Sequence, residues 1–212
     1  MKIYLVRHAE PLSALGSDEQ VPLQEAENHL SANGMTQAEN LAADFSRILG
    51  AEPVEIFCST LLRAQETAER IASKLGVDIR YTALLNERDF SPQNLKSNLE
   101  LKQLQLWSYK NPALSKYGEE TTLAQRARVQ KWLSDFAKNV RLESDINYLI
   151  VCHGGTIEHL VATMMQAPID SISSCITLCD HAHYHQISAI LPERGWLVWR
   201  IEAINLPFSS SL

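Results

Sequence analysis

The sequence lacks a long hydrophobic run. No stretch approaches the roughly 20 apolar residues that a membrane-spanning helix needs. The first apolar stretch, from Ile3 to Val6, is much shorter than the apolar region of a secretion signal. We therefore expect a cytoplasmic protein with no membrane partner.

Positive charge is also scarce. The chain has 19 lysine and arginine residues against 25 aspartate and glutamate residues, which gives a formal net charge of -6. A protein whose main partner is nucleic acid usually carries a broad basic surface, and this composition provides none. A local basic pocket for a small anion remains compatible with these totals.

Cysteine is infrequent, with four residues in mostly apolar surroundings: Cys58, Cys152, Cys175 and Cys179. Such cysteines are typical of buried thiols in a reducing compartment. The pair Cys175 and Cys179 leaves a disulfide or a metal pair open as an alternative. Repeats, low-complexity stretches and linkers are absent from the 212 residues, so we expect one domain over residues 1–212. The sequence gives no indication of an oligomeric state.

Two segments have the apolar spacing of helices. Residues 31–50 predict a helix with Ser31 as its N-cap, and residues 61–76 predict a second; glycines, Gly50 and Gly76, end them. Three apolar runs without alternation predict buried strands, at residues 3–6, 54–59 and 146–152.

Strands that alternate with helices in this way predict a largely parallel sheet covered on both faces. The C-terminal part instead alternates polar and apolar residues around a turn at 192–195, which predicts an antiparallel edge pair. Residues from about 88 to 120 show no strand pattern and predict a small helical insertion. After it, Thr122 and Gln125 resemble a capping box that opens a helix. The expected fold is α/β: a three-layer α/β/α arrangement with a mostly parallel central sheet, an antiparallel C-terminal edge pair and a helical insertion over the active site.

Reactive side chains follow the ends of the predicted buried strands. Arg7 and His8 follow the first strand, Arg63 lies just beyond the second, and His153 and Gly154 follow the third. In a parallel sheet, ligands bind outside the carboxyl ends of the strands, so these residues are expected to meet. Guanidinium groups and the N-terminus of a helix both bind phosphate well. The pattern predicts a site for a phosphoryl group.

Several of these segments resemble one known family in the order in which they occur. "LVRHAE" resembles the Arg-His-Gly signature of the histidine phosphatase superfamily, the phosphoglycerate mutase-like group. "LSANGMTQAENLA" and "CSTLLRAQETAERIA" are similar to its L-T-x-x-G-x-x-Q-A helix and its S-S-x-L-x-R-A-x-Q-T-A segment. "LLNERDF", "GEETTLAQRARVQKWL" and "VCHGGTIEHL" resemble its acid-bearing stretch, its G-G-E-S helix start and its S-H-G-G motif.

The resemblance implies a phosphatase that works through a phosphohistidine. His8 would be the nucleophile, and Arg7, Arg63 and His153 would hold the phosphoryl oxygens. Glu87 would protonate the leaving alcohol and then activate water. The expected substrate is a small phosphomonoester, and the mechanism that the resemblance implies uses neither a metal ion nor a cofactor.

The assignment of Glu87 leaves alternatives open. Its carboxylate could pair with Arg88 at the surface, and Asp89 is the substitute acid. A carboxyl group that donates a proton near neutral pH is expected to have a raised pKa, and burial beneath the insertion would raise it.

The chain departs from the family pattern at two places. Ala9 replaces the glycine that usually follows the histidine. No lysine or arginine lies between Arg7 and Arg47, and the loop over residues 11–30 carries several acidic residues. An acidic loop disfavours a doubly anionic substrate. A cofactor-dependent phosphoglycerate mutase is therefore the weaker alternative, beside a phosphate- or phosphopeptide-binding protein without turnover.

Three histidines near the C-terminus suggest a different activity. His181, His183 and His185 alternate and would share one face of a strand, with Cys175 and Cys179 upstream. This set would suit zinc or nickel. An ordinary half-exposed strand explains the same pattern, and His159 is expected to be structural or near the rim of the pocket.

Overall fold

The computed structural model of the protein describes residues 1–139, 145–168, 178–190 and 197–208. The strands are β1 (Lys2–Arg7), β2 (Val54–Cys58), β3 (Ile79–Tyr81), β4 (Asn147–Cys152), β5 (Tyr184–Ile190) and β6 (Val198–Leu206). The helices are α1 (Ala32–Leu49), α2 (Leu62–Leu75), α3 (Asn98–Lys110), α4 (Thr122–Asn139) and α5 (Gly154–Met164). Among the described residues, no helix is long and apolar enough to cross a membrane.

The strands form one six-stranded sheet in the order β3-β2-β4-β1-β5-β6. Strands β3, β2, β4 and β1 are parallel, whereas β5 pairs antiparallel with β1 and β6 pairs antiparallel with β5. The predicted parallel sheet with an antiparallel edge pair is confirmed. Strand β3 was not predicted, because its three residues are too short and too polar to show a pattern. The predicted turn at 192–195 and Cys175 lie outside the described residues.

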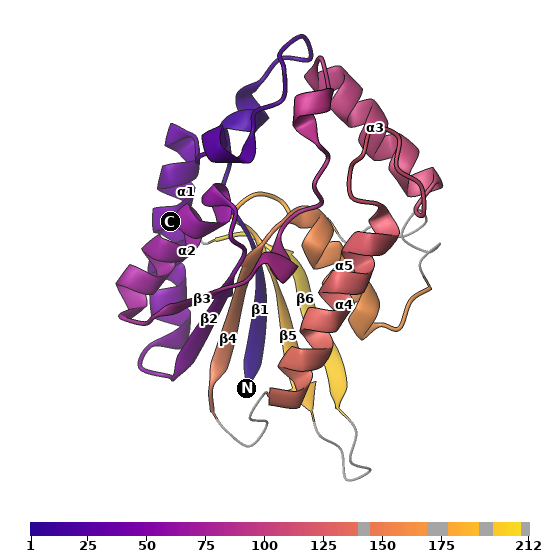
Figure 1. The fold of residues 1–212 in the computed structure, drawn as a ribbon. Helices are drawn as coiled ribbons and strands as arrows, with labels where there is room; N and C mark the ends of the chain where they lie inside the picture. The colour runs from indigo at the N-terminus through magenta and orange to yellow at the C-terminus, as the bar shows by residue number, and fades with distance from the viewer. Residues whose placement is uncertain (140–144, 169–177, 191–196, 209–212) are drawn as a thin grey trace.

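Helices cover both faces of the sheet (Figure 1). Strand β1 sends Tyr4 and Val6 into a core with α1 and α2, while Ile3 and Leu5 enter a second core with α4 and α5. Because both faces of β1 are buried, its apolar residues do not alternate with polar ones. This packing fixes the end of β1, which carries Arg7 and is followed directly by His8.

The predicted boundaries of α1 are confirmed. The Ser31 hydroxyl accepts a hydrogen bond from the backbone N–H of Gly34 at 2.9 Å, which caps the helix. Gly50 ends the helix with a positive φ of 57°. The Ser31 hydroxyl also donates a hydrogen bond to the Glu10 carboxylate, which connects the start of α1 to the segment that follows His8.

The predicted capping box at α4 is wrong. The hydroxyl of Thr121, not Thr122, accepts a hydrogen bond from a first-turn N–H, that of Ala124, at 3.1 Å. The hydroxyl of Thr122 instead accepts from Arg88, and the amide of Gln125 donates to the Glu87 carboxylate. These side chains are committed to tertiary contacts, which the spacing of residues along the helix does not reveal.

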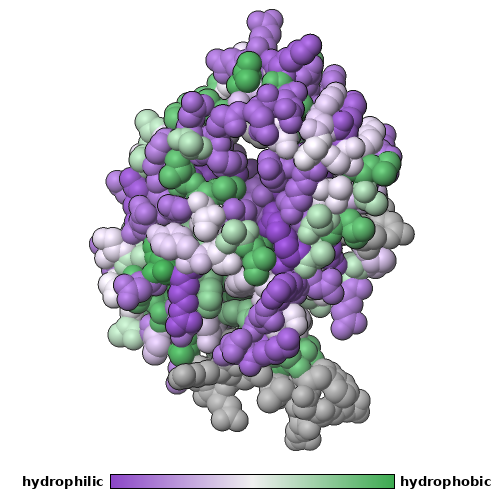
Figure 2. All heavy atoms as spheres, viewed as in Figure 1, coloured by the Kyte–Doolittle hydropathy of each residue, from purple (hydrophilic) through white to green (hydrophobic). Residues whose placement is uncertain are grey.

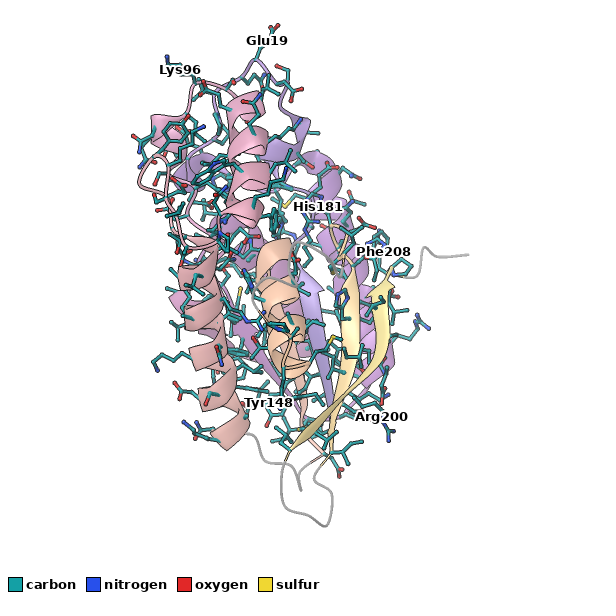
Figure 3. The ribbon with its side chains drawn as sticks, turned by 90° about the vertical axis from the view of Figure 1, so that its right-hand side faces the viewer. Glu19, Lys96, Tyr148, His181, Arg200 and Phe208 are labelled. Carbon is teal, nitrogen blue, oxygen red and sulfur yellow. The ribbon has the colours of Figure 1, made fainter. Side chains whose placement is uncertain are left out.

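The predicted helical insertion contains α3, and it meets the 11–30 loop above the carboxyl ends of the strands (Figure 1). The backbone N–H of Asn98 donates to the Gln20 carbonyl at 2.7 Å, and Lys102 forms an ion pair with Asp18. Glu19 and Lys96 lie at the tips of the two segments (Figure 3). Together the loop and the insertion form an arch over the site described below.

Removing the cap of α1 tests this local structure. Ser31→Ala is expected to lower the free energy of unfolding by about 1 kcal/mol, because the Gly34 N–H loses its partner. Urea denaturation measures the change. Ser73→Ala, on the exposed side of α2, is the matched control and should stay close to wild type. Equal stability of Ser31→Ala and the control would contradict the capping role.

Candidate active site

The carboxyl ends of β1, β4 and β2 lie side by side at one edge of the sheet. Arg7 and His8 come from the end of β1, Arg63 from the first turn of α2 after β2, and His153 from the residue after β4. The rings of His8 and His153 are 4.9 Å apart, and Arg63 Nε lies 3.2 Å from His8 Nε2. The predicted meeting of these four side chains is confirmed.

His8 is buried and has a defined tautomer. Its Nδ1 lies 2.7 Å from the carbonyl oxygen of Ala9. Because a carbonyl oxygen only accepts hydrogen bonds, Nδ1 carries the proton and Nε2 keeps its lone pair. The Ala9 side chain is fully buried, and its backbone N–H donates to the Thr67 hydroxyl at 3.1 Å. Alanine therefore fits where the family usually has glycine.

The surroundings of His8 and His153 disfavour a positive charge on either ring. Burial lowers the pKa of His8 well below its ordinary value of 6.5, and the nearby charge of Arg63 lowers it further. Burial and then Arg63 also lower the pKa of His153. Both imidazoles are thus neutral at pH 7, and the lone pair of His8 Nε2 accepts the hydrogen bond from Arg63 Nε.

Arg63 is buried and has two partners. Its Nε donates to Nε2 of His8, and its Nη1 donates to the carboxylate of Glu25, which comes from the short 3₁₀ turn Glu25–Glu27 in the 11–30 loop. A surface role for Arg63 does not agree with this burial. The acidic loop therefore reaches the same guanidinium that contacts His8, a contact that the local sequence does not reveal.

His153 is held by the neighbouring strand end. The Ser59 hydroxyl donates to the side-chain oxygen of Asn86 at 2.9 Å, so it accepts from Nε2 of His153 at 2.8 Å. The other ring nitrogen, Nδ1, is buried and has no hydrogen-bond partner within the part of the chain that the structure describes. A buried nitrogen of this kind is suited to a ligand atom.

Glu87 is held by three N–H donors: one at the N-terminus of α5, one on α4 and one on the next residue of the chain. Its carboxylate accepts from the backbone of Gly155 at 3.0 Å, from that of Arg88 at 2.9 Å and from the Gln125 amide at 2.8 Å. Burial raises the pKa of Glu87, but these hydrogen bonds and the charge of Arg63 outweigh burial and lower it below its usual value. The predicted raised pKa is therefore wrong.

Asp89, the substitute acid, and Arg88, the suggested surface partner of Glu87, both make other contacts. Asp89 is exposed, and its carboxylate accepts from the backbone N–H of Ser91 at 2.7 Å. The guanidinium of Arg88 is buried; it binds Thr122 and lies 4.2 Å from the centre of the Phe90 ring. Of the two carboxylates, Glu87 is the one that faces the cavity.

A cavity of about 210 Å³ adjoins Arg7 and Gly154 beneath the arch. It is lined by Arg7, Glu87, Arg88, Phe90, Gln105, Tyr109, Thr122, Gln125, Gly154, Gly155 and His159. Burial, then Glu158 and Glu87, raise the pKa of Tyr109 to about 12, so its hydroxyl keeps its proton. Figure 2 shows this face hollowed between the loop and the insertion, with mostly hydrophilic residues around the hollow.

His181 is a site residue that the sequence did not reveal. Arg7 Nη2 lies 2.8 Å from His181 Nε2, and Arg7 Nη1 donates to the Cys179 carbonyl at 2.7 Å. The His181 ring lies 5.3 Å from that of His8. Figure 3 places His181 at the top of the sheet, below the insertion. Its signal in the sequence was a histidine before the last strands, which we interpreted as part of a metal set.

The prediction that three histidines share one strand face is wrong. His181 and His183 precede β5, and only His185 lies on it. His183 Nδ1 lies 3.0 Å from the His181 carbonyl, and His185 Nδ1 accepts from the Asn205 backbone at 3.0 Å. Among the described residues, no three histidine, cysteine, aspartate or glutamate side chains are placed to share a metal ion. The three described cysteines are buried and free: Cys58, Cys152 and Cys179.

The chain is similar to phosphatases of known structure or function. It is 25% identical over 178 residues to the adenosylcobalamin/alpha-ribazole phosphatase of Escherichia coli strain K12, with 81% of this chain and 83% of the relative covered. Among solved structures, a mycobacterial hydrolase has a TM-score of 0.78 at 23% identity, with coverage of 99% of this chain and 92% of the other.

A second solved structure carries a substrate in its name. Mycobacterial glucosyl-3-phosphoglycerate phosphatase, solved as a complex with VO3, has a TM-score of 0.76 at 22% identity, and the match covers 97% of this chain and 98% of the other. The profile of the histidine phosphatase superfamily (branch 1) matches residues 3–202. With the strand-end histidines and arginines in the arrangement described above, this match shows that the chain belongs to the histidine phosphatase superfamily.

Proposed function

We propose that the protein hydrolyses small phosphomonoesters through a phosphohistidine on His8. The observation that carries the proposal is the buried His8 ring, whose unprotonated Nε2 lies beside Arg63. A neutral imidazole is the nucleophilic form, and its tautomer is already correct for attack by Nε2. Similarity to phosphatases supports the general activity.

In the first step, the Arg63 Nε–H that binds His8 Nε2 turns to a phosphoryl oxygen and frees the Nε2 lone pair. That lone pair forms a bond to phosphorus, and the bond from phosphorus to the ester oxygen breaks. The leaving alkoxide takes a proton from Glu87. Glu87 is ionised when no other negative charge is near, since its pKa is lowered. A bound phosphate ester places negative charge beside it, and this like charge raises the pKa so that the carboxyl group can hold a proton.

In the second step, the Glu87 carboxylate takes a proton from a water molecule, and the water oxygen attacks phosphorus. The bond from phosphorus to Nε2 breaks, which releases inorganic phosphate and restores neutral His8. The lowered pKa of Glu87 leaves the carboxylate ionised after the alcohol has left, and its three N–H donors hold it in place. The same hydrogen bonds thus serve both steps.

Arg7, Arg63 and His153 hold the phosphoryl oxygens in this proposal, together with the N–H groups at the start of α5. Guanidinium groups suit the planar arrangement of oxygens in the transition state, and the helix N-terminus adds partial positive charge near Gly154. Protonation of the free Nδ1 of His153 would accompany binding of the dianion. These side chains supply the positive charge that the transition state needs, so no metal ion takes part in the proposed mechanism.

The leaving group occupies the cavity beneath the arch. Most polar groups that line it are uncharged, among them Gln105, Tyr109 and Thr122. This polar lining around a volume of about 210 Å³ suits a small hydroxylated leaving group. Glu25 places a carboxylate on Arg63, one of the groups proposed to bind the phosphoryl group, and a carboxylate there disfavours a second phosphate on the substrate. A small phosphorylated metabolite is therefore the proposed substrate class.

The first test is a phosphate-release panel with wild type and His8→Ala. The panel contains para-nitrophenyl phosphate, sugar phosphates, nucleotides, phosphoglycerates and a phosphopeptide, each with and without EDTA. We expect wild type to release phosphate equally with and without EDTA, and His8→Ala to lose at least about 1,000-fold in kcat, because no nucleophile remains. Ser73→Ala, on the exposed side of α2, is the control.

Two outcomes of the panel contradict the proposal. Wild-type activity in the His8→Ala variant would show that His8 is not the nucleophile. Isomerisation of phosphoglycerates faster than phosphate release would indicate a mutase, and binding of phosphate by wild type without hydrolysis of any ester would indicate a binding protein.

Neighbouring glycines give a matched test of Glu87. A Cβ atom at residue 155 would lie 2.7 Å from Glu87 Oε1, whereas a Cβ at residue 154 would lie 3.5 Å from the nearest Arg7 atoms. Gly155→Ala therefore displaces the carboxylate, and we expect kcat for an alkyl phosphate to fall by about 100-fold. Gly154→Ala leaves the carboxylate in place, so its loss should be as large for para-nitrophenyl phosphate, whose leaving group needs no proton, as for the alkyl phosphate. Gly155→Ala should lose far less with para-nitrophenyl phosphate than with the alkyl phosphate. The same dependence on the leaving group in both variants would contradict the role of Glu87.

The titration of His8 tests the electrostatic part of the proposal. NMR detection of the ring carbons, with His8→Gln to assign the signal, should show no protonation as the pH falls through 6.5, because burial and Arg63 lower the pKa of His8. Arg63→Met should raise that pKa toward 6.5. An ordinary pKa in wild type, or no rise in Arg63→Met, would contradict this account.

A further inference from the structure

We propose that His181 is a positioning residue that holds the Arg7 guanidinium in the orientation needed to bind the phosphoryl group. The proposal rests on the proposed function, in which Arg7 binds phosphoryl oxygens. It assigns a role to a side chain that lies outside the recognised sequence motifs, in the turn before β5.

Arg7 is held by one short segment at both its backbone and its side chain. Its backbone N–H donates to the His183 carbonyl at 3.0 Å, while its two Nη atoms contact the Cys179 carbonyl at 2.7 Å and His181 Nε2 at 2.8 Å. Because a guanidinium is planar, two fixed Nη atoms define the orientation of the whole group. The remaining N–H groups then point in directions set by this segment.

One donor of the Arg7 guanidinium, Nε, is not used by these contacts and lies beside the N-terminus of α5. Arg7 Nε is buried and has no hydrogen-bond partner among the residues that the structure describes. A Cβ atom at Gly154 would lie 3.5 Å from Nε, so this donor lies against the N-terminus of α5. An oxygen atom of a phosphoryl group bound there would satisfy both the helix N-terminus and Nε.

The turn that carries His181 is itself anchored. Asp180 receives a hydrogen bond from Asn205 on β6 at 2.9 Å and donates its backbone N–H to the Asn205 side chain at 2.8 Å. Ala182 is buried with a positive φ of 59°, and its N–H donates to the His8 carbonyl at 3.2 Å. The segment is therefore a rigid support rather than a free loop.

The protonation state of His181 suits this role. Burial, and then the charge of Arg7, lower its pKa to about 4, so the ring is neutral at pH 7. Since the Arg7 guanidinium can only donate, Nε2 of His181 accepts and Nδ1 carries the proton. The ring centre is 5.3 Å from that of His8, yet the hydrogen bond of His181 goes to Arg7.

Three substitutions separate positioning from packing. His181→Ala removes the acceptor, and His181→Gln restores one, because the side-chain amide of glutamine reaches as far as Nε2. His181→Asn carries the same amide but is too short to reach Arg7. The control is Ser73→Ala, on the exposed side of α2 and away from the Arg7 contacts. Thermal unfolding reports whether each variant folds.

The readouts are kcat and KM for para-nitrophenyl phosphate and the Kd for orthovanadate by calorimetry. We expect His181→Ala and His181→Asn to lower kcat/KM by about 10-fold to 100-fold, mostly through kcat, and to weaken vanadate binding. His181→Gln should recover to within about 5-fold of wild type, since it again offers an acceptor to Arg7. Ser73→Ala should match wild type.

A double-mutant cycle tests whether His181 acts through Arg7. In an Arg7→Ala background, His181→Ala should change the Kd for orthovanadate by less than about 2-fold, because the side chain that it positions is gone. Additive effects in the cycle would overturn the proposal and indicate direct contact with the phosphoryl group. Equal losses in His181→Gln and His181→Asn, or wild-type values in His181→Ala, would overturn it as well.

The binding readout keeps the two proposals distinct. If wild type binds orthovanadate but releases no phosphate from any ester, the proposed function fails, and the cycle in vanadate affinity still decides the role of His181. If wild type turns over and the cycle is additive, only the role of His181 fails.

Discussion

The proposed phosphohistidine mechanism depends on one interaction, the hydrogen bond from Arg63 Nε to Nε2 of the buried His8 ring. A neutral imidazole that donates through Nδ1 to the Ala9 carbonyl can accept only at Nε2, the atom that the mechanism needs. The arginine keeps the ring neutral and is placed to bind the phosphoryl group that the ring attacks. The proposed nucleophile and the proposed electrostatic stabiliser are therefore in contact before any substrate binds.

The sheet places these groups, and the elements around it orient them. Parallel packing of β2, β4 and β1 brings their carboxyl ends together, and burial of both faces leaves the strand ends little freedom. Side chains from other parts of the chain then set the details: Glu25 contacts Arg63, Gln125 holds Glu87 and His181 contacts Arg7. Each of these contacts joins segments far apart in the sequence.

This division explains what could be predicted from the sequence. Arg7, His8 and His153 follow unmistakable buried strands, so their convergence could be predicted from strand periodicity and the geometry of parallel sheets. The roles of Gln125 and His181 could not, because they depend on how α4 and the turn before β5 pack against the strand ends. Local patterns misassigned both, as a cap and as a metal ligand. The direction of the Glu87 pKa shift depends on three N–H donors brought by tertiary packing, which no local pattern shows.

The most direct test of the central claim is to trap the intermediate. Wild-type protein would be mixed with para-nitrophenyl phosphate, quenched in base within milliseconds and mapped by mass spectrometry of its peptides. The account predicts an acid-labile, base-stable phosphoryl group on the peptide that contains His8, and on no other histidine. A phosphoryl group on a different residue would contradict the proposed mechanism. So would rapid turnover with no phosphorylated peptide in wild type or in Glu87→Gln, a variant that lacks the proposed base for hydrolysis of the intermediate.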